Sequence, residues 1–376
     1  MKHCFKFLVL SYITISCSSQ KQIVINENTA IKYIGEYKVS SIKSFKQTTV
    51  GGLSGIDYDA RNDVYYLISD DRSDINPARF YTAKIYLNAA GIDSVDFLSV
   101  EYLRQATGEA YPGIKQNPFR VPDPEAIRFN AKTRQLVWCD EGERLLNNDT
   151  VVLINPSVVT MNQSGAYIDS FELPPNMQMK PMLCGPRKNG TFEGLSFTNN
   201  FKSLFVSVEE PLYEDGPRAG LNDSAAWIRI IKFDTKTRKP VGQYGYQIDP
   251  VAFPPVPSDA FKVSGVSEIL AINNHQLLVL ERSYSTGRKS STIKLYLANL
   301  NRAEDISMHK SLPSIFFQPA QKKLLLNLDA LGIYTDNIEG LTFGPRLPDG
   351  RFTLILVSDN NFSPDALTQF LLFTID

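Results

Sequence analysis

A repeat of about 70 residues constrains the fold of this chain more than any other feature. Each copy opens on a short polar segment before an apolar run, and closes on a second apolar run that ends at an acidic residue. Successive openings are 71, 68, 75 and 71 residues apart, at Ser54, Glu125, Glu193, Glu268 and Glu339. The closings follow their openings by 16, 16, 16, 13 and 20 residues, at Asp70, Glu141, Glu209, Glu281 and Asp359. Such a period indicates one supersecondary unit repeated along or around an axis.

Alternation of apolar and polar residues indicates four strands in a unit. In the first unit the expected strands cover 53–58, 64–70, 79–87 and 95–104. In the third unit they cover 192–197, 203–209, 227–233 and 241–248. Four strands per unit predict an all-β fold, a β-propeller with four-stranded blades. We expect five blades, or six if a divergent blade lies in a long linker.

The last unit contains only three expected strands, at 338–343, 352–358 and 368–375. A strand-like segment near the other end of the chain, IKYIGEYKVS from Ile31, is available as the fourth. We expect this N-terminal strand to pair outside the last blade, because that closes the ring and removes an exposed sheet edge.

The first residues have the pattern of an export signal. Lys2 and Lys6 flank a short apolar run, FLVLSYITI, in residues 1–16. Cys17 follows a small residue and precedes Ser-Ser, which resembles a bacterial lipobox. We therefore expect lipidation of Cys17, a tether over 17–28 and a single propeller domain over 29–376, with plain secretion as the alternative. The expected location is the cell envelope, with contact to the membrane only through the lipid anchor.

Composition excludes several classes of partner and cofactor. The 376 residues carry 39 Lys and Arg against 40 Asp and Glu, with the basic residues scattered, so no nucleic-acid surface is indicated. Three His and no Cys/His ligand spacing make a zinc site improbable. Beyond the signal, Cys139 and Cys184 could form a disulfide or remain free thiols. We expect a monomer.

Propeller geometry predicts that the acidic residues meet at one end of the channel. The link between blades and the turn after each second strand lie on the same face, so both sets of repeat acids should surround one mouth. Carboxylates only a few ångströms apart repel by roughly 1 kcal/mol per pair in water and by more where water is scarce. Oxygen ligands without His or Cys favour a hard cation, and a loose ring of oxygens favours Ca²⁺ over Mg²⁺. Arginines could offset the same charge, with candidates Arg72, Arg79, Arg144, Arg187 and Arg282.

Several segments resemble the esterase-like phytase family, also called phytase-like domain proteins. They are GLSGIDYD, YYLISDDR, ARFYTAKI, DPEAIRF, NGTFEGLSF, LLVLERSYS and DNIEGLTF, and the resemblance runs from about Tyr33 to Asp376. It implies an exported β-propeller that acts as a phosphomonoesterase on phytate or a related ester.

Residues that match the family's segments provide the candidate site. As metal ligands we expect Asp70, Asp71, Glu125, Glu209, Glu281, Asp336, Asn337, Asp359 and Asn360. As catalytic groups we expect Glu193, Glu339, Arg79 and Arg282. Structural roles remain an alternative for each, since Asp and Asn also form turns and a buried Glu can accept backbone N–H groups.

Two hypotheses of function follow. The first is a calcium-assisted hydrolase of a small-molecule phosphomonoester or other ester. The second is a non-catalytic surface lipoprotein that binds a ligand or partner and uses calcium structurally. A serine hydrolase is not indicated, because the chain has no G-x-S-x-G elbow and no obvious triad base.

Overall fold

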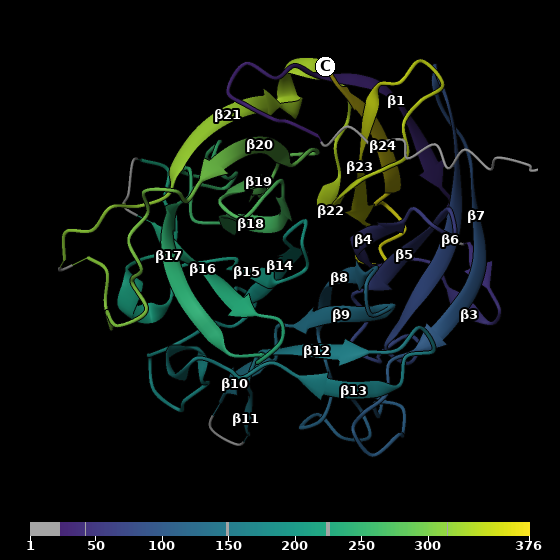
Figure 1. The fold of residues 1–376 in the computed structure, drawn as a ribbon. Helices are drawn as coiled ribbons and strands as arrows, with labels where there is room; N and C mark the ends of the chain where they lie inside the picture. Colours follow the sequence, from purple (N-terminus) through teal and green to yellow (C-terminus); the bar gives the residue numbers. More distant parts are fainter. Residues whose placement is uncertain (1–22, 42, 148–149, 223–225, 314) are drawn as a thin grey trace, which may run out of the picture.

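The computed structural model describes residues 23–41, 43–147, 150–222, 226–313 and 315–376. These residues form five four-stranded antiparallel sheets around a central axis, which confirms the five-bladed β-propeller (Figure 1). Cys17, the expected signal segment 1–16 and the first part of the expected tether lie outside the described residues. No helix in the described part of the chain is long and apolar enough to cross a membrane.

The blades follow the chain in order. Blade 1 contains β4 (Leu53–Asp59), β5 (Val64–Ser69), β6 (Arg79–Asn88) and β7 (Gly91–Tyr102). Blade 2 contains β8 (Pro124–Asn130), β9 (Gln135–Asp140), β12 (Ser157–Met161) and β13 (Tyr167–Ser170). Blade 3 contains β14 (Phe192–Phe197), β15 (Ser203–Val208), β16 (Trp227–Asp234) and β17 (Pro240–Gln247). Blade 4 contains β18 (Lys262–Ala271), β19 (Gln276–Ser285), β20 (Thr292–Asn299) and β21 (Gln321–Asn327).

Blade 5 combines both ends of the chain. It contains β22 (Asn337–Phe343), β23 (Phe352–Asp359), β24 (Thr368–Ile375) and, on its outer edge, β1 (Ile31–Val39). Strands β1 and β24 pair antiparallel from Ile31↔Ile375 to Val39↔Thr368. The predicted closure of the ring by the N-terminal strand is therefore confirmed.

Shorter elements lie outside the blades. Two hairpins are formed by β2 (Ser44–Phe45) with β3 (Thr48–Thr49) and by β10 (Glu143–Leu146) with β11 (Val151–Ile154). Three short 3₁₀ turns are η1 (Pro175–Met177), η2 (Tyr213–Asp215) and η3 (Leu328–Leu331). Cys139 is buried and Cys184 half-buried, and both are free thiols, so the disulfide alternative is wrong.

The hydrophobic core lies between blades. One cluster joins Leu67 and Tyr81 of blade 1 to Val357 and Phe370 of blade 5. Inner strands such as β8 are buried on both faces, which explains why their sequences are more continuously apolar than alternating. Because each blade buries its faces against its neighbours, no blade could be stable alone.

Each inner strand carries one extra residue near its start, a β-bulge. In blade 1 the register passes from Leu53↔Ser69 to Gly55↔Ile68, which leaves Ser54 bulged. The same shift occurs in the other blades, between Pro124 and Ile127, Phe192 and Leu195, Val266 and Glu268, and Ile338 and Gly340. Bulges re-aim side chains, and this one recurs at the same rung of all five sheets.

Arg128 of β8 closes the axis of the ring. Its guanidinium donates hydrogen bonds to main-chain carbonyls in three other blades, those of Ile56, Ile269 and Leu341. It also pairs with the Glu268 carboxylate of β18 at 2.7 Å. The Oε1 atom of Glu268 accepts a hydrogen bond from the Leu195 N–H of blade 3 at 3.1 Å. Arg128 and Glu268, the axial brace, therefore connect all five blades.

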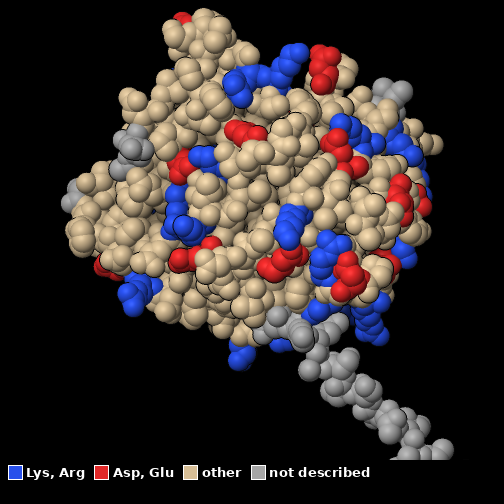
Figure 2. Space-filling view, turned by 90° about the horizontal axis from the view of Figure 1, so that it is seen from above, with Lys and Arg blue, Asp and Glu red and all other residues tan. Residues whose placement is uncertain are grey.

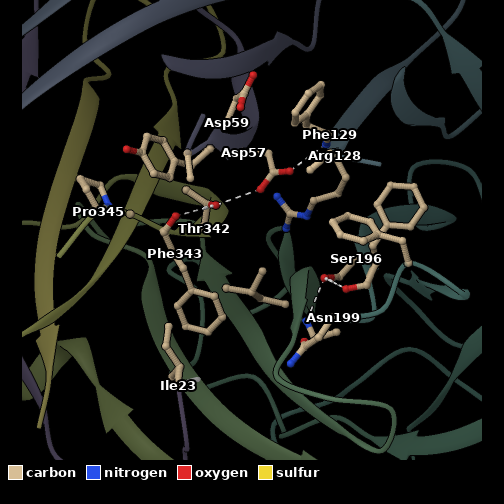
Figure 3. A pocket seen from close by; sticks show the side chains of 18 of the residues that line it. Ile23, Asp57, Asp59, Arg128, Phe129, Ser196, Asn199, Thr342, Phe343 and Pro345 are labelled. Atoms are coloured by element: carbon tan, nitrogen blue, oxygen red, sulfur yellow. Dashed lines mark hydrogen bonds between the residues drawn. The ribbon is translucent and has the colours of Figure 1, made fainter. Parts of the chain in front are cut away.

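The axial brace separates two cavities. One, of about 790 Å³, lies where the inner strands end, and its aromatic lining includes Phe129, Phe197 and Phe343. Figure 3 shows Arg128 reaching into this cavity beside Asp57. The other, of about 450 Å³, lies where the inner strands begin. Among the described residues, none lines both.

Candidate functional site

Two rings of residues surround the mouth where the inner strands begin. The first, the bulge ring, consists of the residue after the last paired residue before each bulge: Ser54, Glu125, Glu193, Ser267 and Glu339. That last paired residue has a partner on the second strand of its blade. The second ring, the closing ring, consists of the residue that follows this partner: Asp70, Glu141, Glu209, Arg282 and Asp359. The repeat therefore places seven of its acidic residues at one mouth, as the propeller geometry predicted.

Blade 4 departs from the acidic pattern. Its register pairs Val266 with Glu281, so Ser267 and Arg282 occupy the ring positions. The prediction that Glu268 and Glu281 lie in the rings is wrong by one residue. Because side chains alternate along a strand, Glu281 instead contacts Tyr246 and Lys322, and Glu268 belongs to the axial brace.

The cavity at this mouth is strongly acidic. Among the described residues that line it are nine carboxylates, Asp70, Asp123, Glu125, Glu141, Glu193, Glu209, Asp336, Glu339 and Asp359. The cationic side chains in the same lining are three: Arg72, Arg282 and Lys289. The formal excess of negative charge, nine minus three, is six. A positive species in the cavity would therefore be strongly favoured.

Arg282 is the cation of the closing ring. Its Nη2 atom lies 3.1 Å from the Glu209 carboxylate and 3.5 Å from that of Glu339, and its Nη1 donates to Asn337 Oδ1 at 2.6 Å. Gly265, paired with Arg282 on the neighbouring strand, makes room for this contact. A Cβ atom at Gly265 would lie 2.7 Å from Glu209 Cγ, so a larger residue would push Glu209 away from Arg282.

Two groups of three carboxylates have the geometry of a metal site. In each group one oxygen per residue lies within 4.8 Å of the others; the groups are Asp70, Asp123 and Glu125, and Glu125, Glu141 and Glu193. Glu125 belongs to both. In addition, Glu339 Oε2 is buried and has no hydrogen-bond partner within the described structure. An all-oxygen donor set with an unsatisfied buried oxygen fits a hard cation such as Ca²⁺.

Burial and mutual repulsion raise the pKa values of these carboxyls. Desolvation, followed by neighbouring acids, raises the pKa values of Glu125 and Glu193 well above their ordinary value. Desolvation raises the pKa of Glu339 to about 8 and that of Asp359 to about 6, although Arg282 opposes both shifts. Without added positive charge, Glu339 therefore holds its proton near neutral pH, and burial favours the protonated form of the other carboxyls.

Asp336 and Asn337 support the rings from blade 5. Asp336 accepts hydrogen bonds from the N–H groups of Leu367 and Asn337, which fixes the approach to β22. Asn337 donates to Glu339 Oε1 at 2.8 Å while accepting from Arg282. Both residues line the cavity, as predicted, but their oxygens are already engaged within the protein.

Three other predicted residues lie outside the lining of this cavity. Asp71 and Arg79 form a buried pair at 2.6 Å, and Asp71 also accepts N–H groups of the following turn. Asn360 Oδ1 accepts from Gly52 N at 3.0 Å. These contacts engage the three side chains in loop packing, and none of the three is among the described residues that line the cavity.

Other lining residues were missed as ligands or catalytic groups. Asp123, just before β8, belongs to one carboxylate group and lies 3.5 Å from Arg72. Lys289 and Asn189 also line the cavity. An acid followed by Pro at the start of a repeat was a usable signal for Asp123, whereas Lys289 and Asn189 lie in loops with no repeat position.

The side of the molecule seen in Figure 2 carries no comparable concentration of charge. On the side of the molecule seen in Figure 2, basic and acidic side chains are interspersed. The charge imbalance is thus a property of the cavity, and it does not extend over this side as a basic stripe of the kind that binds nucleic acid.

Fold and site together define a class: a five-bladed propeller with a carboxylate-lined cavity at one mouth and a half-buried arginine in its lining. A comparison with protein families matches residues 48–362 to the phytase-like family described as "Esterase-like activity of phytase". The chain belongs to this family, which confirms the resemblance. Comparison with curated proteins finds no match.

Solved structures show distant similarity. An α-L-arabinofuranosidase from Lactobacillus brevis is 9% identical over 89% of this chain and 94% of its own, with a TM-score of 0.43. A GH43 β-1,3-galactosidase with galactodeoxynojirimycin is 11% identical over 90% and 95%, with a TM-score of 0.45. A bifunctional GH43-CE protein from Bacteroides eggerthii is 10% identical with a TM-score of 0.40, over 87% of this chain but only 34% of its own. Similarity this distant carries no information about activity.

Proposed function

We propose that this protein is a calcium-assisted hydrolase of a phosphomonoester or another ester, with its active site in the acidic cavity. The observation that carries the proposal is the excess of six carboxylates in a cavity that also contains Arg282, in a chain of the phytase-like family. An anionic ester could not enter such a cavity unless cations offset the carboxylates.

The residues that would hold calcium are the two carboxylate groups that share Glu125. Bound calcium would neutralise the anionic oxygens of the ester and polarise the group that water attacks. Their high pKa values mean that these carboxyls must lose protons to bind the ion, so affinity should rise with pH. Glu193, expected as catalytic, belongs to one of these groups.

In the proposed reaction, Arg282 and Glu339 would act on the substrate. Arg282 is held by Glu209 and Asn337, so its guanidinium is oriented to bind an ester oxygen and to stabilise the charge that develops on it. Glu339 Oε2 has no partner in the described structure, and a pKa of about 8 suits a base that accepts the proton of the attacking water. The leaving alcohol oxygen then takes a proton from solvent or from a neighbouring protonated carboxyl.

The test is turnover of p-nitrophenyl phosphate, phytate and p-nitrophenyl acetate by the purified chain, with calcium or with a chelator. We expect calcium-dependent turnover that falls by about 100-fold or more in Glu339→Gln and Glu193→Gln, the usual size of an acid–base contribution. Glu281→Gln is the matched control, since this buried glutamate of blade 4 faces away from the cavity.

Turnover that survives both the chelator and the two cavity variants would contradict the proposal. Calcium binding without turnover of any ester would favour the second hypothesis, a ligand-binding propeller with structural calcium. Lipidation at Cys17, a cell-envelope location and a monomeric state belong to the same proposal and are tested by lipid labelling, fractionation and light scattering.

A further inference from the structure

Blade 4 is taller than the others at the acidic mouth. Strands β18 and β19 are ten residues each, and beyond the pair Val266↔Glu281 their ladder continues through Gly265↔Arg282 to Lys262↔Ser285. In blades 1 and 3 the ladder of the inner pair starts at Leu53↔Ser69 and Phe192↔Val208, with nothing beyond. At about 3.3 Å per residue, the extra four pairs raise blade 4 by roughly 13 Å.

The extension presents an apolar surface to the cavity. Phe261, Val263 and Tyr284, the blade-4 wall, all line it. The rings of Phe261 and Tyr284 lie 6.3 Å apart, inclined at 38°. The carbonyl of Phe261 accepts hydrogen bonds from Thr286 N at 2.9 Å and Thr286 Oγ1 at 3.0 Å, so its main chain is held in place.

The blade-4 wall continues the strand face that carries Arg282, towards the outside of the mouth. Tyr284 follows Arg282 by two residues in β19, so both side chains project from the same face of the strand. Val263 is the cross-strand neighbour of Tyr284. Elsewhere the lining is dominated by carboxylates, so the cavity has one apolar side, and that side is adjacent to Arg282.

We propose that the blade-4 wall binds the organic group of the substrate, and that this group is a ring with an apolar face, aryl or sugar, bearing a single acidic ester. The inference rests on the proposed function. The ester oxygens would lie at Arg282, and the ring would stack on Phe261 above it. A ring with charged groups at every position suits the site less, because it would place charge against the aromatic side chains and desolvate it there.

The kinetic test compares wild type, Phe261→Ala and Phe119→Ala in saturating calcium. Phe119 is the matched control, since it is 57% exposed against 58% for Phe261 and does not line the cavity. Phenyl phosphate and glucose 1-phosphate separate the two kinds of ring, and ethyl phosphate lacks one. We expect Phe261→Ala to raise KM for at least one ring substrate roughly three- to tenfold, the size of one lost ring contact, with kcat little changed. The KM for ethyl phosphate should change less than twofold.

Calorimetry with calcium-loaded protein gives a readout that needs no turnover. Wild type should bind phenylphosphonate more tightly than methylphosphonate, and Phe261→Ala should lose this preference while Phe119→Ala keeps it. That result supports the inference even if no ester is hydrolysed. Equal affinities for the two phosphonates in wild type, or equal changes in both variants, would overturn the inference alone. Failure to bind either phosphonate, together with absence of turnover, would overturn the inference and the phosphoester form of the proposed function.

Discussion

Three arginines, two buried and one half-buried, show how the position of a residue along a strand decides what its guanidinium does. Arg79 pairs with Asp71 and fixes a loop between strands. Arg128 crosses the axis and pairs with Glu268. Arg282 alone among these three lines the acidic cavity. Burial of such a charge is tolerated only where its hydrogen bonds and its counter-charge are supplied.

The axial brace gives a prediction for stability. Arg128→Met should lower the free energy of unfolding by about 3–5 kcal/mol, because it leaves Glu268 buried without its counter-charge. The Glu268 carboxyl already has a pKa raised to about 8 by burial, and Arg128 is the main group that opposes the shift. In denaturant unfolding, the double variant with Glu268→Gln should lose less than the sum of the two single variants. Strict additivity would show that the pair is not coupled.

At the scale of elements, the sequence predicted the five blades correctly but predicted the strand register of blade 4 wrongly by one residue. The spacing of the repeat predicted the strand ranges, the closure of the ring and the acidic mouth. This works because repeated units with the same fold place equivalent residues at equivalent positions in their sheets. In blade 4 the assigned spacing from Glu268 to Glu281 is 13 residues, against 16 in the first three units, whereas Ser267 to Arg282 is 15. The shorter spacing was the sign of a shifted register. The spacing alone did not reveal the shift, because the other units led us to expect an acidic residue at both ring positions of blade 4. A shift of one residue in register reverses which side chains face the cavity.

Strand β1 should be essential for the stability of blade 5. Removal of residues 1–39 would leave the edge of β24 unpaired and would expose Phe373, which packs against Tyr33 at a ring distance of 5.6 Å. We expect thermal unfolding at a temperature lower by roughly 10 °C or more, with aggregation visible in size-exclusion chromatography. A chain that lacks only residues 1–22 is the control and should unfold like the full chain. Equal unfolding temperatures for the two truncations would contradict this role of β1.

At the scale of the whole molecule, the ring concentrates charge that the chain as a whole lacks. The formal net charge is −1, yet one cavity holds an excess of six carboxylates. Long-range topology produces this contrast, since the acids come from four blades and are far apart in sequence. Stability should consequently depend on pH and on calcium in opposite ways.

In the absence of calcium the protein should become less stable as pH rises. Burial raises the pKa values of Asp359 to about 6, Asp140 to about 7 and Glu339 to about 8. A carboxyl whose pKa is higher in the folded than in the unfolded state stabilises the folded state. This stabilisation is complete below the unfolded pKa of about 4 and is lost as pH rises through 6–8. Thermal scans in chelator should therefore show an unfolding temperature that falls by several degrees between pH 5 and pH 8.

Calcium should reverse the trend, because under the proposed function the ion would bind the ionised carboxylates and its stabilisation would grow as protons leave. The unfolding temperature in calcium minus that in chelator should therefore increase from pH 5 to pH 8. A difference that stays constant or shrinks with pH would mean that the buried carboxyls do not bind the ion.

The axial brace also determines the route by which small molecules can reach and leave the acidic cavity. Because Arg128 crosses the axis below the acidic cavity, a substrate of the proposed hydrolase would enter and its product would leave through the same mouth. The acid anion released by such a reaction would bind near Arg282, where the next substrate must bind, and would therefore be a competitive inhibitor.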